Sequence, residues 1–539
     1  MMTASTPGRL AACGGRGYWR QRADVVVVGT GVAGLAAARA AQLAGSRVVV
    51  VGKSGETATA YAQGGIAVVI PDTDDSVHAH VADTVAAGAG LCDVEAVTSI
   101  VADGYAAVRE LVGAGAAFDE VGPGDWSLTR EGGHSRRRII HAGGDATGAE
   151  VQRALAAATQ TLDIRPNHVA LQVLHHDGVV SGLLVLSPEG PGVLTAPSVI
   201  LATGGLGQLY TATTNPDGST GDGIALALRA GLPVRDIEFI QFHPTMLYTG
   251  AAGGRCPLIT EALRGEGAIL RDRRGDSVTD GVHPMGDLAP RDIVAAAIDA
   301  RLSATGDDYV YLDARSVPDV AARFPTVTAA CLAAGIDPAR QPIPVVPGAH
   351  YSCGGVVTDV HGRTEMAGLF AAGEVGRTGM HGGNRLASNS LLEGLVVGGR
   401  AGRAAAEQAR AAGGGNRVPE PDLGKRPALD RDALQRGMTR YASVVRDAAG
   451  LGQLGELLTG ARGKAMTNRA AVEDAALTVT ASAVATAAAA RAESRGCHHR
   501  SDRPDRDSAF GVSIDVRLDG TGCAVVAMPV GVGSSAARA

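Results

Sequence analysis

The 539-residue chain lacks the features that mark several classes of protein. Its seven cysteines are an odd number with no C-x-x-C pair, which argues against a disulfide framework or a structural zinc site and favours a reducing, cytoplasmic setting. The formal net charge of -6 provides no general attraction to nucleic acid. The longest uncharged stretch, 475–490, is mostly Ala and Thr; it is too short and too weakly apolar to span a membrane and predicts a packed helix. We therefore expect a small-molecule enzyme without a membrane span.

Glycine, by contrast, is abundant, and its arrangement near the start of the chain predicts a dinucleotide-binding βαβ unit. Four valines over 25–28 predict a buried strand, and Gly29, Gly31 and Gly34 follow it before an alanine-rich helix and a second strand over 47–51. These glycines permit a tight turn and a close approach of the backbone to a pyrophosphate at the helix N-terminus. The acid expected after the second strand is missing and Lys53 stands nearby, so no carboxylate is placed to bind the ribose of NAD.

Two further segments complete an FAD pattern, namely a strand and glycine turn over 198–205 and a strand that ends in Glu374, an acceptor for hydroxyl groups. The residues between them are too many for a short crossover. We therefore expect an α/β protein with a Rossmann-like FAD-binding domain, an inserted α+β capping domain and a C-terminal helical domain. The expected parts are a loose leader over 1–20, a discontinuous FAD domain over 21–236 and 351–415, the substrate-binding cap over 237–350, the helical domain over 416–500, and a partly disordered tail over 501–539.

A series of ordered motifs carries a resemblance to a known family. The motifs are 61–65 (YAQGG), 130–135 (REGGHS), 214–216 (TNP), 221–223 (GDG), 241–244 (QFHP), 260–266 (TEALRGE), 290–292 (PRD), 349–351 (AHY), 381–385 (HGGNR) and 388–393 (SNSLLE). On these residues the chain closely resembles the L-aspartate oxidases, within the flavoprotein family that includes the flavin subunits of succinate dehydrogenase and fumarate reductase.

The resemblance implies an activity, acceptors and a partner. It implies that FAD oxidises L-aspartate to iminoaspartate, and that the electrons pass to O2, giving H2O2, or to fumarate, giving succinate. This reaction is the first step of de novo NAD biosynthesis in the family. Because iminoaspartate is labile, the resemblance also implies that the product passes to quinolinate synthase.

The resemblance also implies how FAD is held. Ala58 stands where succinate dehydrogenases carry the histidine that links to the flavin, so we expect non-covalent FAD. The implied cofactor contacts are Gly29, Thr30, Gly31, Val32, Ala33, Gly34, Lys53, Ala58, Thr59, Ala60, Tyr61, Ala62, Gln63, Gly64, Gly65, Asp222, Glu374, Ser390 and Leu391. Ala58 and Ala60 replace bulkier or polar residues usual in aspartate oxidases, so we expect the side-chain packing on the flavin to differ.

A substrate with two carboxylates requires cations and hydrogen-bond donors. Arg385 is the best candidate anchor, since a guanidinium can bind a carboxylate through two hydrogen bonds and the neighbouring glycines let the chain approach a ligand; the alternative is a structural ion pair. The remaining substrate contacts implied by the resemblance are Gln241, His243, Thr260 and His350. The histidine pairs 175–176 and 498–499 lie in polar, turn-like sequence, and we expect them to be solvated and to bind no metal.

Glu261 and Arg264 are three residues apart, so they share one face of a helix and can pair. In fumarate-reducing relatives the corresponding Glu and two Arg residues form a proton route, and the resemblance implies this role for Glu261, Arg264 and Arg291. In aspartate oxidation we expect Arg291 to orient the substrate or to assist its deprotonation, because arginine is a poor resting base. The alternative is a plain salt-bridge network.

The resemblance implies that Glu131 discriminates between substrates. Relatives that act on succinate or fumarate have an uncharged residue here, whereas aspartate oxidases have Glu, which can pair with the α-amino group. A buried carboxylate without a cation is costly, so Glu131 should disfavour succinate; the alternative is a surface acid in a polar loop.

Two other functions compete with aspartate oxidation. A soluble fumarate reductase or succinate dehydrogenase flavoprotein calls for an apolar residue at 131 and usually His at 58. A flavin-binding protein without turnover would lack Arg291, Arg385 or His243. Residue 131 is Glu and residue 58 is Ala, which argues against the first alternative. Arg291, Arg385 and His243 are all present, which argues against the second.

Overall fold

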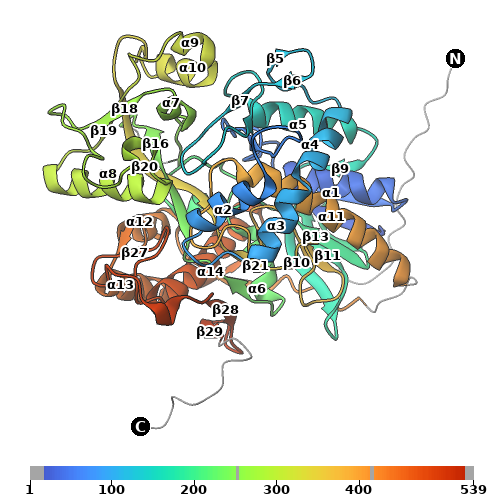
Figure 1. Cartoon of the computed structure of the whole chain (residues 1–539). Helices are drawn as coiled ribbons and strands as arrows, with labels where there is room; N and C mark the ends of the chain where they lie inside the picture. The colour runs from blue at the N-terminus through green and yellow to red at the C-terminus, as the bar shows by residue number, and fades with distance from the viewer. Residues whose placement is uncertain (1–16, 251–253, 413–417, 528–539) are drawn as a thin grey trace.

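The computed structural model describes residues 17–250, 254–412 and 418–527, and its centre is a parallel sheet. The strand order is β22 (Leu369–Ala371), β13 (Ser198–Leu201), β2 (Val25–Val28), β3 (Val48–Val51) and β9 (Asp163–Arg165). Every residue of β2 and β3 is buried, as expected of parallel strands covered by helices. The predicted βαβ unit is therefore present (Figure 1).

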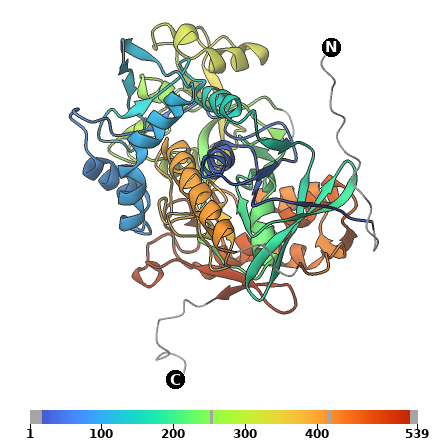
Figure 2. The same cartoon turned by 90° about the vertical axis from the view of Figure 1, so that its right-hand side faces the viewer.

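Helices cover this sheet closely. α1 (Val32–Leu43) packs along α11 (Asn389–Ala411), and both contact the central strands; Figure 2 shows α11 beside α1 in the middle of the molecule. The approach depends on glycine, because a Cβ at Gly402 would overlap the carbonyl of Ala37. α3 (Val94–Ala102) and α4 (Gly104–Gly113) pack against α11, and α5 (Thr147–Ala158) packs against α1. α2 (Val77–Ala87) packs against α3.

A second sheet flanks the first, in the order β1 (Trp19–Arg22), β12 (Gly190–Thr195), β11 (Val179–Ser187) and β10 (Val169–His176). The predicted leader therefore ends too late, since β1 pairs with β12 and the Trp19 ring lies where Gly192 has no side chain. Local sequence could not predict this pairing because the partner strand is far along the chain. Residues 1–16 of the predicted leader lie outside the described residues.

The segment between the halves of the FAD pattern forms a separate layer with its own apolar core (upper left in Figure 1). Its sheet contains β16 (Ile240–Leu247), β20 (Ile343–Ser352), β19 (Val310–Asp313) and β18 (Ile269–Arg271), joined by β14 (Ala212–Thr213) and β17 (Gly254–Arg255). Its helices are α7 (Ala262–Gly265), α8 (Arg291–Thr305), α9 (Val320–Arg323) and α10 (Pro325–Ala333). The boundary predicted at 350 falls within β20.

The C-terminal part contains α12 (Arg431–Tyr441), α13 (Ala448–Thr459) and α14 (Arg469–Ala490), with a hairpin of β24 (Lys425–Ala428) and β26 (Arg462–Ala465). α14 begins where the Asn468 side chain accepts a hydrogen bond from the Ala471 amide. Its alanines are mostly buried against α6 (Asp222–Arg229) and α13, so the stretch 475–490 is a packed helix. No helix among the described residues meets the length and apolarity needed to cross a bilayer.

Part of the tail is structured, and one expectation about the histidines before it was wrong. In the tail, β28 (Asp515–Leu518) pairs with β15 (Val234–Arg235) and β29 (Ala524–Ala527) in a sheet that also holds β21 (Gly355–Val357) and β23 (Gly376–Arg377). His498 is fully buried, and its Nδ1 lies 2.9 Å from a guanidinium nitrogen of Arg446. The partners of both segments are distant in sequence, so neither showed a local pattern. Residues 528–539 lie outside the described part.

Candidate active site

A cavity of about 460 Å³ begins at the ends of β2 and β3 and extends to the sheet of the capping layer. Every predicted cofactor residue except Gly34 lines it. Gly34 instead packs α1 onto the preceding turn, where a Cβ would overlap the carbonyl of Gly29. The dispersed segments 29–33, 58–65 and 390–391 thus meet at one cavity, as the FAD pattern requires.

The cavity suits FAD by shape and by its polar groups. Gly29 has a φ of 121° and lies so close to Ala202 that only glycine fits. Gly31, at the N-cap of α1, provides no side-chain hydrogen bond, while the Val32 amide donates to the Thr59 hydroxyl at 2.9 Å; the N-terminus of such a helix is a site where a pyrophosphate can bind. Gln63 Oε1 is buried without a hydrogen-bond partner among the described residues, so it can accept a hydrogen bond from a ligand.

Lys53 and Glu374 lie at different places along the cavity. The Lys53 ammonium contacts Asp222 at 2.6 Å and Glu473 of α14 at 3.0 Å; no local pattern predicts the contact with Glu473. Glu374 Oε1 accepts a hydrogen bond from the Ser352 amide at 2.9 Å. Burial raises the pKa of Glu374 to about 7, so its charge changes near neutral pH.

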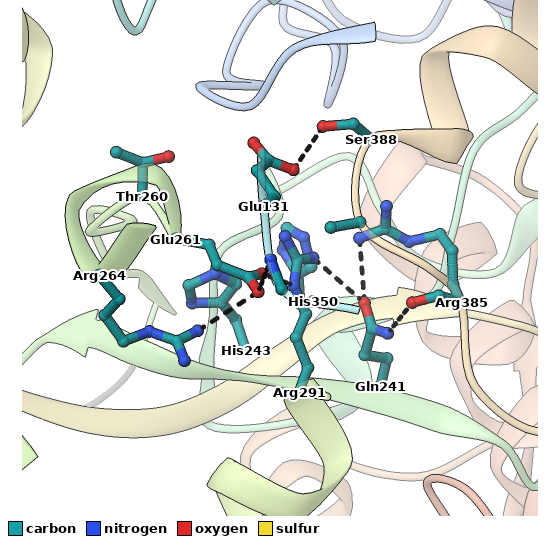
Figure 3. Close-up of polar contacts among 12 residues, drawn as sticks. Glu131, Gln241, His243, Thr260, Glu261, Arg264, Arg291, His350, Arg385 and Ser388 are labelled. Atoms are coloured by element: carbon teal, nitrogen blue, oxygen red, sulfur yellow. Dashed lines mark hydrogen bonds and ion pairs between the residues drawn. The ribbon is translucent and has the colours of Figure 1, made fainter. Parts of the chain in front are cut away.

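Beyond the cofactor cradle lies a cluster of charged groups centred on Glu261 (Figure 3). Arg291 donates to Glu261 at 2.5 Å, the amide of Gly132 donates at 3.1 Å, and Arg264 lies 3.7 Å away. Burial opposes ionisation of Glu261, but Arg291 and Arg264 outweigh it, so its pKa is lowered. The helical pairing expected for Glu261 and Arg264 is present, and Glu261 fixes the direction of Arg291.

Gln241 separates two guanidinium groups (Figure 3). Its Oε1 accepts from Arg385 at 3.0 Å and from Arg291 at 3.3 Å, and its amide nitrogen donates to the Arg385 carbonyl at 2.7 Å. Arg385 lies 4.5 Å from the ring centre of Tyr351, and its guanidinium donates only to the Leu386 carbonyl, Ser390 and Gln241, with no carboxylate partner in the described chain. Burial, with repulsion from Arg291, lowers the pKa of Arg385 to about 10. Arg385 is therefore not the structural ion pair considered as the alternative.

The two predicted histidines are neutral donors or acceptors. The Thr245 amide donates to His243 Nδ1 at 3.2 Å, so the ring proton is on Nε2, which is buried without a partner among the described atoms. His350 Nδ1 lies 2.7 Å from the Thr214 hydroxyl. Burial and the charge of Arg291 hold the pKa of both histidines well below the usual value, so both are uncharged at neutral pH.

Glu131 follows β7 (Leu128–Thr129) and is only 3% exposed, so it is not a surface acid. Its Oε2 accepts a hydrogen bond from the Ser388 hydroxyl at 2.6 Å, and its Oε1 is buried without a hydrogen-bond partner in the described chain. His134 connects the segment of Glu131 to the segment of Ser388, since its Nε2 lies 2.9 Å from the Ala387 carbonyl oxygen. Sequence reasoning missed Ser388, although it begins the motif 388–393.

The predicted substrate and catalytic residues fall into two groups. Those that line the cavity are His243, Thr260, Glu261, Arg291, His350 and Arg385. Glu131, Gln241 and Arg264 do not line it, but each contacts a residue that does. The structure therefore brings all nine residues to one end of the cofactor cavity.

A cavity that suits FAD and opens onto the guanidinium of Arg385, which has no carboxylate partner among the described residues, is typical of a flavoprotein oxidoreductase. The chain is 69% identical over 494 residues to L-aspartate oxidase of Mycobacterium tuberculosis, covering 90% of this chain and 93% of that one. It is 48% identical to L-aspartate oxidase of Streptomyces coelicolor, covering 91% and 90%. This chain belongs to the L-aspartate oxidase family, and FAD is its cofactor.

Family models and solved structures agree with this placement. The model for an FAD binding domain matches residues 24–391, and that for the fumarate reductase flavoprotein C-terminus matches 431–512. FrdA of E. coli quinol fumarate reductase has a TM-score of 0.84 at 32% identity and covers 94% of this chain and 96% of its own. Mycobacterium smegmatis Sdh1 has a TM-score of 0.82 at 32% identity, covering 95% and 94%. The expected fold is confirmed, and the higher identity of the aspartate oxidases disfavours the fumarate reductase alternative.

Proposed function

We propose that this chain oxidises L-aspartate to iminoaspartate, with O2 (giving H2O2) or fumarate (giving succinate) as electron acceptor. This activity would be the first step of de novo NAD biosynthesis, towards quinolinate. The observation that carries the proposal is the buried Glu131 carboxylate, whose Oε1 has no hydrogen-bond partner among the described residues, near Arg385, whose guanidinium has no carboxylate partner there. Such a site suits a ligand with two carboxylates and one amine.

Each residue has a role in this proposal. Arg385 binds one carboxylate through its guanidinium, and His243, with its free Nε2–H, His350 and Thr260 hydrogen-bond the other carboxylate oxygens. FAD, when bound, accepts the hydride from Cα. Arg291, held by Glu261, orients the substrate so that Cα faces the cofactor cradle. Glu131 supplies the negative charge that the amine requires and takes up its proton.

The direct test is anaerobic mixing of the FAD-loaded protein with L-aspartate, D-aspartate or succinate in separate experiments, following the absorbance of the oxidised flavin. We expect bleaching by L-aspartate alone. Bleaching by succinate, or by none of the three, would overturn the proposal.

The flavin should be released completely when the protein unfolds. Ala58 has only a methyl side chain where a covalent link would form, so we propose that FAD is held by non-covalent contacts alone. Unfolding in guanidinium chloride followed by ultrafiltration should place all the flavin absorbance in the filtrate. Yellow colour retained with the polypeptide would contradict this expectation.

The affinity for FAD should rise several-fold between pH 6 and pH 8. We propose that Glu374 accepts a hydrogen bond from an FAD hydroxyl, and its pKa of about 7 means that the carboxyl is largely protonated at pH 6. Binding then releases a proton, so higher pH favours the complex. Titration of the apoprotein with FAD, followed by flavin fluorescence, measures the dissociation constant. In Glu374→Gln the constant should be larger and should lose this pH dependence; an unchanged pH dependence would exclude Glu374 as its source.

We also propose a cytoplasmic location and transfer of the labile iminoaspartate to quinolinate synthase. The free thiols support the first proposal, and the chemistry of the product supports the second. If transfer occurs, the quinolinate yield from the two enzymes together should exceed the yield when synthase is added after a delay.

A further inference from the structure

Asp292 and Asn384 belong to two motifs of this protein, and neither contacts the substrate in the proposed reaction. Asp292 lies in the first turn of α8, directly after Arg291, and Asn384 directly precedes Arg385. The two side chains are joined, because Asn384 Nδ2 donates to Asp292 Oδ1 at 2.9 Å. Neither residue lines the cavity, so any effect on a ligand there has to pass through another side chain.

Gln241 is that intermediate side chain. Its Nε2 donates to Asn384 Oδ1 at 2.7 Å, and its Oε1 accepts from Arg385 and Arg291 (Figure 3). Asp292, Asn384 and Gln241 thus form a hydrogen-bonded series, the amide network, that ends on the two guanidinium groups. Gln241 is fully buried and Asn384 almost so, so bulk water has little access to these contacts.

The direction of the amide network is set at Asp292. Burial raises the pKa of this carboxyl to about 6, so it is largely ionised at neutral pH and above and can then only accept hydrogen bonds. Asn384 therefore turns its NH2 group to Asp292 and its oxygen to Gln241. Gln241 in turn presents its NH2 group to Asn384, and also to the Arg385 carbonyl, and its oxygen to the guanidinium groups. The reverse orientation would place an NH2 group beside two cations that have no acceptor.

Cys497 supports this orientation of Asn384. Its thiol donates to Asn384 Oδ1 at 3.1 Å, and its amide donates to the Gly383 carbonyl at 2.9 Å. Burial holds the pKa of the thiol well above its usual range, so the thiol remains a donor. The Asn384 oxygen therefore receives two donors, from Cys497 and Gln241, while the nitrogen faces the carboxylate.

Arg385 depends on the amide network more than Arg291 does. Arg291 also donates to Glu261 at 2.5 Å, so its position has a second support. The Arg385 guanidinium lies 3.0 Å from Gln241 Oε1, whereas its other two acceptors are 3.4 Å away. Loss of the network should therefore displace the Arg385 guanidinium and leave Arg291 in place.

We propose that Asp292 and Asn384 are positioning residues for substrate binding, which act through Gln241 to hold Arg385 in the orientation that binds a carboxylate. This inference rests on the proposed function, in which Arg385 anchors the dicarboxylate. L-aspartate and fumarate both use this anchor, so the amide network affects the binding of both. Glu131 differs in this respect, because it acts on the amine that only L-aspartate carries.

Asn384→Leu is the direct test, since leucine has a similar size and no amide. We expect KM for both L-aspartate and fumarate to rise roughly 5- to 50-fold, the range for removing one partner of a buried hydrogen bond. The turnover number kcat should change less than about threefold, because the lost interaction contributes to binding in the ground state and the transition state alike. Steady-state kinetics with the FAD-loaded protein measure both constants.

Variants of Asp292 and Gln241 distinguish positioning from a general structural role. Asp292→Leu should also raise KM, and Asp292→Asn, whose oxygen can still accept from Asn384, should raise it less. The double variant Gln241→Leu/Asn384→Leu should have the KM of Gln241→Leu alone, because Asn384 acts only through Gln241. The matched control Asp299→Leu removes a carboxylate from the same helix, away from the cavity, and should leave KM unchanged.

The outcomes separate this inference from the proposed function. If the wild-type protein oxidises L-aspartate, then an unchanged KM in Asn384→Leu, a loss confined to kcat or additive effects in the double variant would overturn only the positioning role. If the wild-type protein does not oxidise L-aspartate, the proposed function fails, and titration with succinate, followed by flavin absorbance, decides the positioning role. Weaker binding of succinate by Asn384→Leu would support it. Equal affinity, or no binding by the wild-type protein, would overturn it.

Discussion

Glu131→Gln should lower kcat/KM for L-aspartate by roughly 100-fold or more. Removing one partner of a buried charged pair costs about 2–5 kcal/mol, and each 1.4 kcal/mol is a factor of ten. Glutamine keeps the size of the side chain and its contact with Ser388 but removes the charge that the amine requires. Fumarate has no amine, so fumarate reduction by the same variant should change little. Steady-state rates with the two substrates provide the comparison.

The matched control for this variant is Asp125→Asn, which removes one negative charge from an exposed side chain of the preceding segment. We expect both reactions to be unaffected in this control. If Glu131→Gln lowered both reactions equally, Glu131 would act on the fold or on the cofactor, and the preference for an amino acid would need another origin.

Arg385→Met should abolish activity and at the same time stabilise the protein. Arg385 is buried without a carboxylate partner in the described chain, and its pKa of about 10 instead of 12.5 corresponds to about 3 kcal/mol against the charged form. For a base whose pKa is lowered on folding, this cost is present in full at pH 7 and declines only as the pH rises from about 10 towards 12.5. Methionine fills a similar volume without a charge. We expect kcat/KM for both L-aspartate and fumarate to fall roughly 100-fold or more.

Chemical denaturation of the substrate-free protein measures the second part of this prediction. The free energy of unfolding should rise by about 1–3 kcal/mol at pH 7, since lost contacts offset some of the gain. A dicarboxylate such as succinate should raise the thermal midpoint of the wild-type protein but not that of the variant. A less stable variant would show that Arg385 has a structural counter-charge after all. Arg517→Met, which removes a guanidinium paired with Glu365 near the surface, should leave activity unchanged.

The parts of the site that could be predicted from sequence are those with a local pattern. The turn at Gly29 is dictated by adjacent residues, because a buried strand, a glycine turn and a helix must follow one another to bind a pyrophosphate. The pairing of Glu261 with Arg264 follows from helical spacing. Arg385 was a candidate because glycines stand beside it. In each of these cases the observed geometry involves few residues and short separations.

The residues that sequence analysis missed depend on contacts between distant segments. Ser388 contacts Glu131, 257 residues earlier, and no spacing rule relates the two. The same is true of β28, whose partner β15 lies about 280 residues before it, and of His498, buried beside Arg446. Turn-like sequence predicts solvation of its polar residues, yet burial is allowed when a distant partner satisfies the polar group.

The contact of Lys53 with Glu473 has a consequence for how the molecule matures. Lys53 follows β3 and is synthesised 420 residues before Glu473 of α14. Ser390 and Leu391 of the cavity wall also come late. A nascent chain therefore carries an incomplete cradle until α14 has been synthesised, so the complete set of contacts around FAD forms only after this helix has joined the earlier segments.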